Sequence, residues 1–179
     1  MPALSPPVVA VHQSFLAAMA EFVAEGRGGP DDFSMVAREI QDFSPTWDTP
    51  AGFAEYVTAL RAQALEETPR PEHFVPSTTL WWVDGSSYYG RLAIRHRLTP
   101  NLLEVGGHIG YDVRPTARGN GYATAMLRAA LPIARSLGIE SALLTCDTAN
   151  VISRRVIETN GGVFEDERDG KLRFWIPLP

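Results

Sequence analysis

The chain has 179 residues, enough for one domain with a substantial core, because a domain of about this size buries roughly 70% of its unfolded surface. Its 16 basic and 21 acidic residues give a net charge of −5, which argues against nucleic-acid binding through a broad basic face. Cys146 is the only cysteine, so an intrachain disulfide is excluded, and neither a charged leader nor an apolar run of bilayer length is present. We therefore expect a cytoplasmic protein without nucleic-acid or membrane partners.

Residues 1–76 are expected to be mainly helical. Apolar residues recur at helical spacing between Val11 and Val23 and again between Phe53 and Leu60. The second helix should end before the Pro69-Arg-Pro71 break, because proline disrupts a helix interior.

Three consecutive strands are expected next, at Thr78–Val83, Tyr88–Leu98 and Leu103–Val113. A turn at Asp84-Gly85 separates the first two, and short connections of this kind imply antiparallel pairing. Residues 77–179 should therefore form the sheet core of the domain.

A glycine-rich stretch follows the third strand, at Arg118-Gly-Asn-Gly-Tyr-Ala123, and apolar residues at helical spacing continue from there to Leu137. The glycines thus lie at a helix N-terminus, which has unpartnered N–H groups and the positive end of the helix dipole. Such a site binds phosphate groups readily.

Another strand, from Leu143 to Asp147, and a helix opened by Asn150 come next; a turn at Gly161-Gly162 and closing strands through Phe164 and Phe174 complete the chain. We predict a single α/β domain of the α+β mixed type. Its central sheet should be mixed but mostly antiparallel and twisted, with helices on both faces.

Other readings of the glycine stretch require residues that are absent. A P-loop needs a Lys-Ser/Thr pair after its last glycine, and a dinucleotide fold needs a third glycine or alanine with an acidic residue after the next strand. An ordinary glycine-rich turn between a strand and a helix remains as the alternative.

The pattern Arg118-x-x-Gly121-x-Ala123 resembles the Gln/Arg-x-x-Gly-x-Gly/Ala signature of the GCN5-related N-acetyltransferases (GNAT superfamily). The segment from Asn150 to Gly162 resembles the second motif of that family, and the two motifs cover roughly residues 104–168. More local stretches, such as 106–111 and 145–147, are similar to a bacterial subgroup of uncharacterised acetyltransferases.

The resemblance implies an enzyme that transfers an acetyl group from acetyl-CoA to an amine on a small molecule. The amine would attack the thioester directly within a ternary complex, and the enzyme would be a monomer or a homodimer. It also implies that the N–H of Tyr111 faces the thioester carbonyl and stabilises the oxyanion, that Val113 pairs with the pantetheine arm, and that residues 1–76 shape the acceptor side. The cofactor-binding residues implied are Tyr111, Val113, Arg118, Gly119, Asn120, Gly121, Tyr122, Ala123, Asn150 and Ser153.

A base must remove a proton from the amine, and the expected strand at Leu103–Val113 offers two candidates. Side chains alternate along a strand, so Glu104 and His108 would share one face, with glycines between them that admit a ligand or another backbone. The alternatives are a histidine held by a core hydrogen bond and a glutamate paired with Arg95 or Arg97.

The sequence departs from the family at Ile157, where many members have a tyrosine that protonates the departing thiolate. The thiolate could leave unaided, or Ser153, Tyr111, Tyr122 or a water could replace the tyrosine. The departure keeps open a non-catalytic acyl-CoA-binding module, and acetylation of a protein amine is a further alternative.

Three smaller expectations complete the analysis. The four histidines are scattered without ligand spacing, so no metal site is expected. Arg91 and Arg97 are expected to be solvated, and Cys146 to be a buried, inert thiol.

Overall fold

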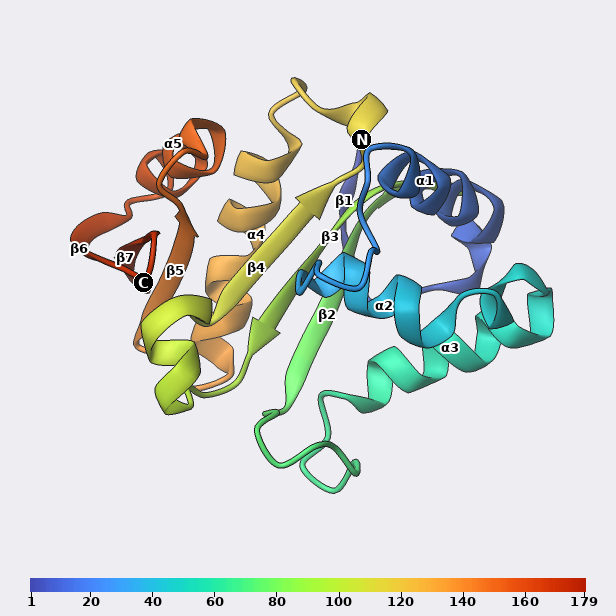
Figure 1. Cartoon of the computed structure of the whole chain (residues 1–179), viewed down its shortest axis with the longest axis horizontal. Coiled ribbons are helices and arrows are strands. Elements are labelled where there is room, and N and C mark those ends of the chain that lie inside the picture. The colour runs from blue at the N-terminus through green and yellow to red at the C-terminus, as the bar shows by residue number, and fades with distance from the viewer.

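The computed structural model describes residues 1–179 and arranges the strands in two antiparallel sheets (Figure 1). The first sheet has the order β1-β2-β3-β4, with strands at Ala3–Ser5, Ser77–Asp84, Ser87–Arg95 and Ile109–Val113. The second has the order β5-β7-β6, with strands at Ser141–Asp147, Lys171–Pro177 and Val163–Arg168.

The hairpin of β2 and β3 forms where the sequence predicts it. Gly85 adopts φ 58° in the turn, a conformation that costs glycine little, and Asp84 pairs with Ser87 on either side. β3 also pairs antiparallel with β4, as expected, although β4 begins only at Ile109.

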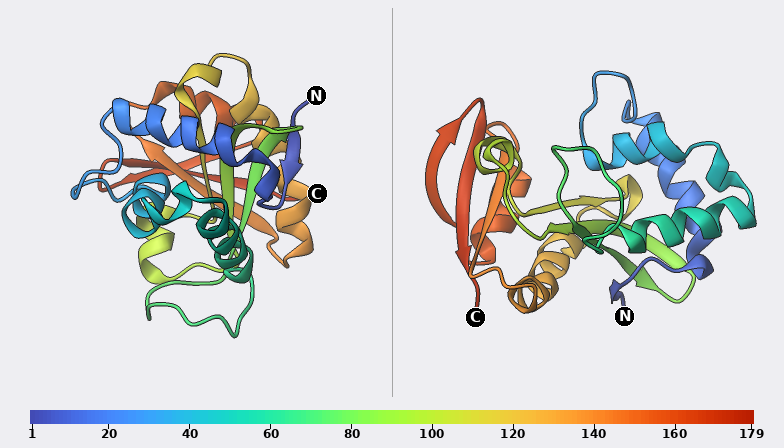
Figure 2. Two further views of the ribbon diagram at one scale, coloured as in Figure 1. Left: turned by 90° about the vertical axis from the view of Figure 1, so that its right-hand side faces the viewer. Right: turned by 90° about the horizontal axis from the view of Figure 1, so that it is seen from below.

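Helices cover both faces of the first sheet (Figure 2). On one face lie α1 (His12–Ala24), α2 (Met35–Phe43) and α3 (Pro50–Ala62), and on the other lies α4 (Tyr122–Ser136). α5 (Val151–Thr159) packs beside α4 and against β5 of the second sheet. Short helical turns occur at Val9–Val11 (η1), Thr46–Asp48 (η2), Leu102–Gly106 (η3, a π-helix) and Pro115–Ala117 (η4). No helix is both long and apolar enough to span a bilayer.

The adjacent tryptophans of β2 show how the two faces are filled, since successive strand residues point to opposite sides. Trp81 packs among the aromatic residues of α1 and α3, with its ring centroid 5.4 Å from that of Phe15. Trp82 belongs to the core formed with α4. Both are buried.

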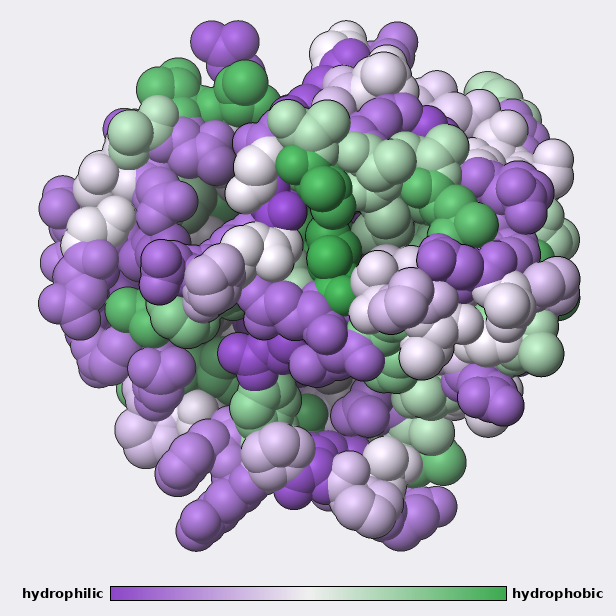
Figure 3. Space-filling view, turned by 45° about the vertical axis from the view of Figure 1, so that its right-hand side comes forward, coloured by the Kyte–Doolittle hydropathy of each residue, from purple (hydrophilic) through white to green (hydrophobic).

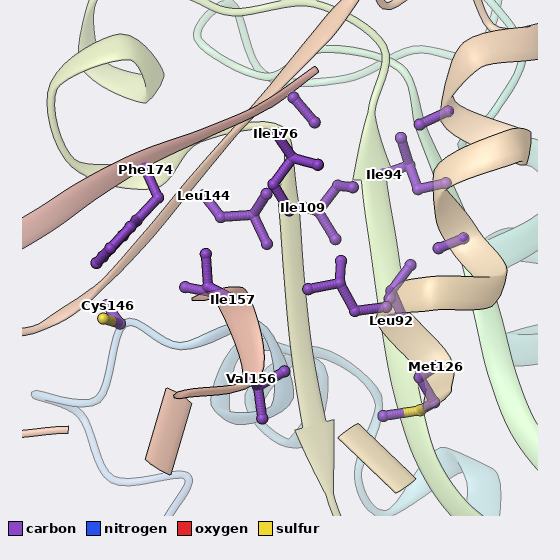
Figure 4. Close-up of a cluster of buried hydrophobic side chains, with 14 of the residues drawn as sticks. Leu92, Ile94, Ile109, Met126, Leu144, Cys146, Val156, Ile157, Phe174 and Ile176 are labelled. Atoms are coloured by element: carbon purple, nitrogen blue, oxygen red, sulfur yellow. The ribbon is translucent and has the colours of Figure 1, made fainter. Parts of the chain in front are cut away.

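The core beneath α4 and α5 joins the two sheets. Figure 4 shows Leu92 of β3 and Ile109 of β4 in the same buried cluster as Leu144 of β5 and Phe174 of β7. Hydrophobic contact thus connects sheets that share little backbone hydrogen bonding.

The mixed α/β fold with helices on both faces agrees with the prediction, but the expected single sheet needs a correction. The chain crosses from β4 through α4 to β5, and the two strands are hydrogen-bonded only at one end, through His108 and Leu143. Beyond this point the strands separate, and backbone groups of both are left free for another partner.

Candidate active site

The N-terminus of α4 carries an uninterrupted series of free backbone donors. Gly119 and Gly121 have φ 81° and 73°, and a Cβ at either position would meet no atom within 4 Å, so the backbone there is open to solvent. None of the N–H groups from Gly119 to Thr124 donates a hydrogen bond within the protein. Together with the positive end of the helix dipole, this row of donors fits the pyrophosphate of a CoA molecule.

The edge of β4 that faces β5 makes no backbone hydrogen bond with that strand. The N–H of Arg95 donates to the carbonyl of His108 (2.7 Å), and that of Arg114 donates to Tyr89 (2.9 Å). Because backbone groups alternate along an antiparallel strand, every second residue of β4 between these bonds points away from β3. The residues that face away are Ile109, Tyr111 and Val113.

His108 closes the end of the gap between the strands. Its N–H donates to the carbonyl of Leu143 (2.7 Å), while the N–H of Leu143 donates to His108 Nδ1 (2.9 Å). Gly107 has φ 67°, and a Cβ there would lie 2.5 Å from the same carbonyl, so this close approach needs glycine. Gly107 therefore allows the close approach of another backbone. The sequence alone left open whether the glycines of this segment admit a backbone or a ligand.

The hydrogen bond to Nδ1 fixes the chemistry of His108. Because Nδ1 accepts, the proton of the neutral ring resides on Nε2. Burial, and secondarily the charge of Arg95, lower the pKa of His108 to about 4. The ring is thus neutral at neutral pH, and protonation would break the bond to Leu143.

Glu104 does not lie on a strand, so the predicted shared strand face of Glu104 and His108 is wrong. Residues Leu102–Gly106 form the π-helix η3, and Glu104 pairs with Arg168 of β6 (2.7 Å) rather than with Arg95 or Arg97. The order β5-β7-β6 places this ion pair at the edge of the second sheet farthest from β5.

Side chains from distant strands explain why this segment is not extended. Arg95 Nη1 donates to the carbonyls of Gly106 (3.2 Å) and Gly107 (3.1 Å), and Thr145 Oγ1 donates to that of Val105 (2.9 Å). Arg173, which is 1% exposed, donates through Nε to the carbonyl of Leu103 (3.0 Å). These bonds replace a strand ladder along η3.

The α1 helix supports the loop that precedes α4. Arg118 pairs with Glu25 through two contacts of 2.8 Å, and its Nε donates to the carbonyl of Val113 (3.2 Å). The hydrogen bond from Arg118 lowers the pKa of Glu25. Asn120 Nδ2 donates to the carbonyl of Ala117 (3.0 Å), so this side chain shapes the loop from within.

The remaining predicted cofactor-binding residues lie in the first turns of α4 and α5. Tyr122 packs near Tyr89, with ring centroids 5.2 Å apart, and Ala123 follows it along α4. Asn150 caps α5 as predicted, since its side chain accepts the N–H of Ser153 (3.0 Å).

Tyr111 reaches across the gap to α5. Its hydroxyl lies 2.8 Å from Ser153 Oγ, and burial raises the pKa of Tyr111 to about 12. Ile157 is fully buried beside Leu144 and Cys146, so its position on α5 faces the core (Figure 4). Cys146 is buried as expected, and burial raises the pKa of its thiol.

The opposite face of the first sheet holds a polar cluster that the sequence analysis missed. Arg91 is 3% exposed, so the expectation that it is solvated is wrong; it contacts Glu39 of α2, which also accepts the hydroxyl of Tyr56 (2.7 Å). The position of Arg91 beside Leu92, inside an otherwise apolar strand, was the signal that could have found it.

A family model described as the acetyltransferase (GNAT) domain matches residues 30–163 of the chain. That span includes the free edge of β4, the N-terminus of α4 and all of α5. No curated protein matches the sequence.

Solved structures of acetyltransferases share the fold at low sequence identity. Mycobacterium smegmatis RimJ in complex with CoA-disulfide is 18% identical with a TM-score of 0.66, and the match covers 97% of this chain and 80% of RimJ. An acetyltransferase from Salmonella typhimurium that modifies the N-terminal serine of ribosomal protein L7/L12 is 13% identical, with a TM-score of 0.59 and coverage of 98% and 94%.

A third structure was solved with a donor molecule in place. The microcin C7 self-immunity acetyltransferase MccE, in complex with acetyl-CoA and AMP, is 11% identical with a TM-score of 0.63, and the match covers 99% of this chain and 92% of MccE. At these identities the likeness concerns the fold, whereas the family model covers most of the sequence. The chain therefore belongs to the GNAT family of acetyltransferases.

Proposed function

We propose that this protein transfers an acetyl group from acetyl-CoA to an amine on a small molecule, by direct attack within a ternary complex. The observation that carries the proposal is the row of unpartnered N–H groups from Gly119 to Thr124, which continues toward the free edge of β4. A phosphate chain followed by an extended pantetheine arm has the shape and polarity that these two features require.

Donor binding would use mainly backbone groups. The N–H groups at the start of α4 would bind the pyrophosphate, Val113 would pair with the pantetheine arm, and Asn150 and Ser153 would border that arm from α5. Arg118 lies at the loop, but its pairing with Glu25 makes it a support of the site in the absence of donor. The residues proposed for the pyrophosphate are Gly119, Asn120, Gly121, Tyr122 and Ala123.

Acetyl-CoA would supply an activated thioester, and Tyr111 would act on it through two groups. Its N–H points into the gap and would stabilise the oxyanion, which is often the largest catalytic contribution. Its hydroxyl would donate a hydrogen bond to the departing thiolate. Full proton transfer is disfavoured, because the pKa of Tyr111 is about 12 whereas that of a thiol is about 8.5.

Glu104 and His108 remain the predicted bases, and each would need a different change before it could accept the proton of the amine. His108 would have to release the N–H of Leu143 before accepting a proton. Glu104 is 46% exposed but is paired with Arg168, so it would act through water along η3.

Thiol release from acetyl-CoA with a panel of amines tests the proposal. We expect release that depends on the amine, together with a singly acetylated product. Calorimetry with acetyl-CoA on the same protein separates the alternative of an acyl-CoA-binding module, which would bind acetyl-CoA without turnover of any amine.

Acetylation of a protein amine is the second candidate. It is motivated by the fold relative that modifies the N-terminal serine of L7/L12. Peptides with free and blocked N-termini, included in the panel, would distinguish a protein N-terminus from a small-molecule acceptor.

A further inference from the structure

Three arginines lie on the side of the first sheet opposite α4, where α2 covers β3 and β4. Arg91 and Arg95 are four residues apart on β3 and therefore share this face, and Arg38 belongs to α2, which lies over it. Burial lowers the pKa of Arg95, and the charges of Arg91 and Arg38 lower it further, so the three guanidinium groups interact electrostatically.

The packing of α2 on the sheet explains this gathering. Met35 lies against Gly110 of β4, where a Cβ would come within 2.5 Å of its methyl group. One turn later Glu39 contacts Arg91, so the stretch of α2 that contains Arg38 runs from β4 toward β3. Figure 3 turns this side toward the viewer and shows apolar (green) and strongly hydrophilic (purple) side chains meeting near the middle of the face.

The charges of this cluster are not balanced within the protein. Glu39 contacts Arg91, but neither Arg38 nor Arg95 forms an ion pair with a carboxylate. Unbalanced positive charge in a chain of net charge −5 favours an anionic ligand. Other arginines nearby do have carboxylate partners: Arg27, Arg97, Arg114 and Arg118.

Both unpaired guanidinium groups retain free donors. Arg95 uses Nη1 for the carbonyls of Gly106 and Gly107, which leaves Nε and Nη2 without a protein acceptor. The guanidinium of Arg38 stacks on Phe74, 4.5 Å from the ring centroid, and makes no hydrogen bond. Arg38 is exposed, whereas Arg95 is partly buried, and partial burial of an unpaired cation is unfavourable. The planar donors of arginine match a carboxylate well.

We propose, on the basis of the function proposed above, that the acceptor amine carries a carboxylate and that this carboxylate binds between Arg38 and Arg95. Arg95 holds the residues that lead directly into His108 and β4, so the anion would be bound where β4 begins. From there the amine of the same molecule would be directed along β4 toward the N–H of Tyr111.

Matched acceptors test the proposal by turnover. Free amino acids are compared with their carboxamides. Peptides with glutamate at the second position are compared with the same peptides carrying glutamine there. A preference within the first pair indicates a small-molecule acceptor, and a preference within the second indicates an acidic peptide. We expect the carboxylate member of one pair to be preferred by about tenfold or more in kcat/KM.

Variants at both positions, compared with one control variant, assign the preference to the two arginines. Arg38→Gln should remove most of the preference through KM of the acceptor, with kcat and the KM of acetyl-CoA unchanged. Arg95→Gln should also lower the preference for the carboxylate acceptor. Arg95→Lys keeps the positive charge and should retain part of that preference, so it serves as the test if Arg95→Gln fails to fold. Arg135→Gln, which removes an exposed arginine at the far end of α4, is the matched control and should behave as the parent protein.

A binding measurement makes the test independent of turnover. N-acetylated amino acids and their carboxamides serve as product analogues in calorimetric titrations, and the carboxylates should bind the parent protein more tightly than they bind Arg38→Gln. Equal binding of both analogues, or equal turnover of matched acceptors, overturns the inference and leaves the proposed function intact. Absence of amine-dependent thiol release instead contradicts the proposed function.

Discussion

His108 provides a prediction in which stability and catalysis can be separated. Its ring joins β4 to β5 by accepting the N–H of Leu143, and this contact exists only while Nδ1 is unprotonated. Replacing His108 by asparagine keeps an acceptor near the position of Nδ1 but removes the titration. Replacing it by alanine removes both and leaves the N–H of Leu143, a fully buried residue, without a partner.

The magnitude follows from the pKa. Burial lowers the pKa of His108 from 6.5 to about 4, so between these pH values the unfolded chain binds more protons than the folded protein. The stabilisation from the neutral ring is complete above pH 6.5 and is lost as the pH falls toward 4. At 1.36 kcal/mol per pKa unit, the loss reaches about 3 kcal/mol as an upper limit.

Urea unfolding of the parent protein and both variants, from pH 4 to pH 8, measures this effect. The free energy of unfolding of His108→Asn should depend less on pH than that of the parent, with the difference developing below pH 6.5. At pH 8, His108→Ala should be less stable than the parent by about 1–3 kcal/mol from the unpaired N–H alone. An identical pH dependence in His108→Asn and the parent would refute the reasoning.

The same variants test the predicted base. If His108 removes the proton from the amine, His108→Asn should lose about a hundredfold or more in turnover at pH 8 while remaining folded. If the ring only joins the strands, turnover of His108→Asn should remain close to that of the parent.

Three further predictions concern the donor site. Gly121→Ala should weaken acetyl-CoA binding about tenfold in calorimetry, because φ 73° strains alanine and a methyl group enters the open cradle; unchanged affinity would contradict the cradle. Tyr111→Phe should lower kcat without changing the affinity for acetyl-CoA. A loss of acetyl-CoA affinity as large as the loss of kcat would indicate a packing role instead. Glu25→Gln should tighten acetyl-CoA binding by releasing Arg118, whereas weaker binding would assign Glu25 to support of the loop.

Local chemistry made part of the site predictable from the sequence. Gly119 and Gly121 precede an apolar helical pattern, and Asn150 opens another, so each identifies a helix start without knowledge of the fold. Alternation along an extended strand likewise accounts for the positions of Trp81 and Trp82 on opposite faces of β2.

The segment before β4 could not be predicted in this way. Leu103 and Val105 alternate with polar or small residues, which is typical of a strand, yet the segment folds as a π-helix. Its carbonyls accept hydrogen bonds from Arg95, Thr145 and Arg173, side chains that only the tertiary structure brings together.

The burial of Arg91 in β3 could not be predicted for a related reason. Arg91 is stabilised by Glu39, which lies on a helix more than fifty residues earlier in the chain. A charged residue in a strand is usually solvated unless it is paired, and the pairing partner is not visible in the local pattern.

Titration of isotopically labelled protein with acetyl-CoA, followed by amide NMR, tests most directly where the donor binds. The amide resonances of Gly119 to Thr124 should shift most, since these N–H groups have no partner in the protein, and those of Tyr111 and Val113 should shift with them. Saturable binding that leaves these resonances unchanged would place the donor elsewhere and contradict the proposed site.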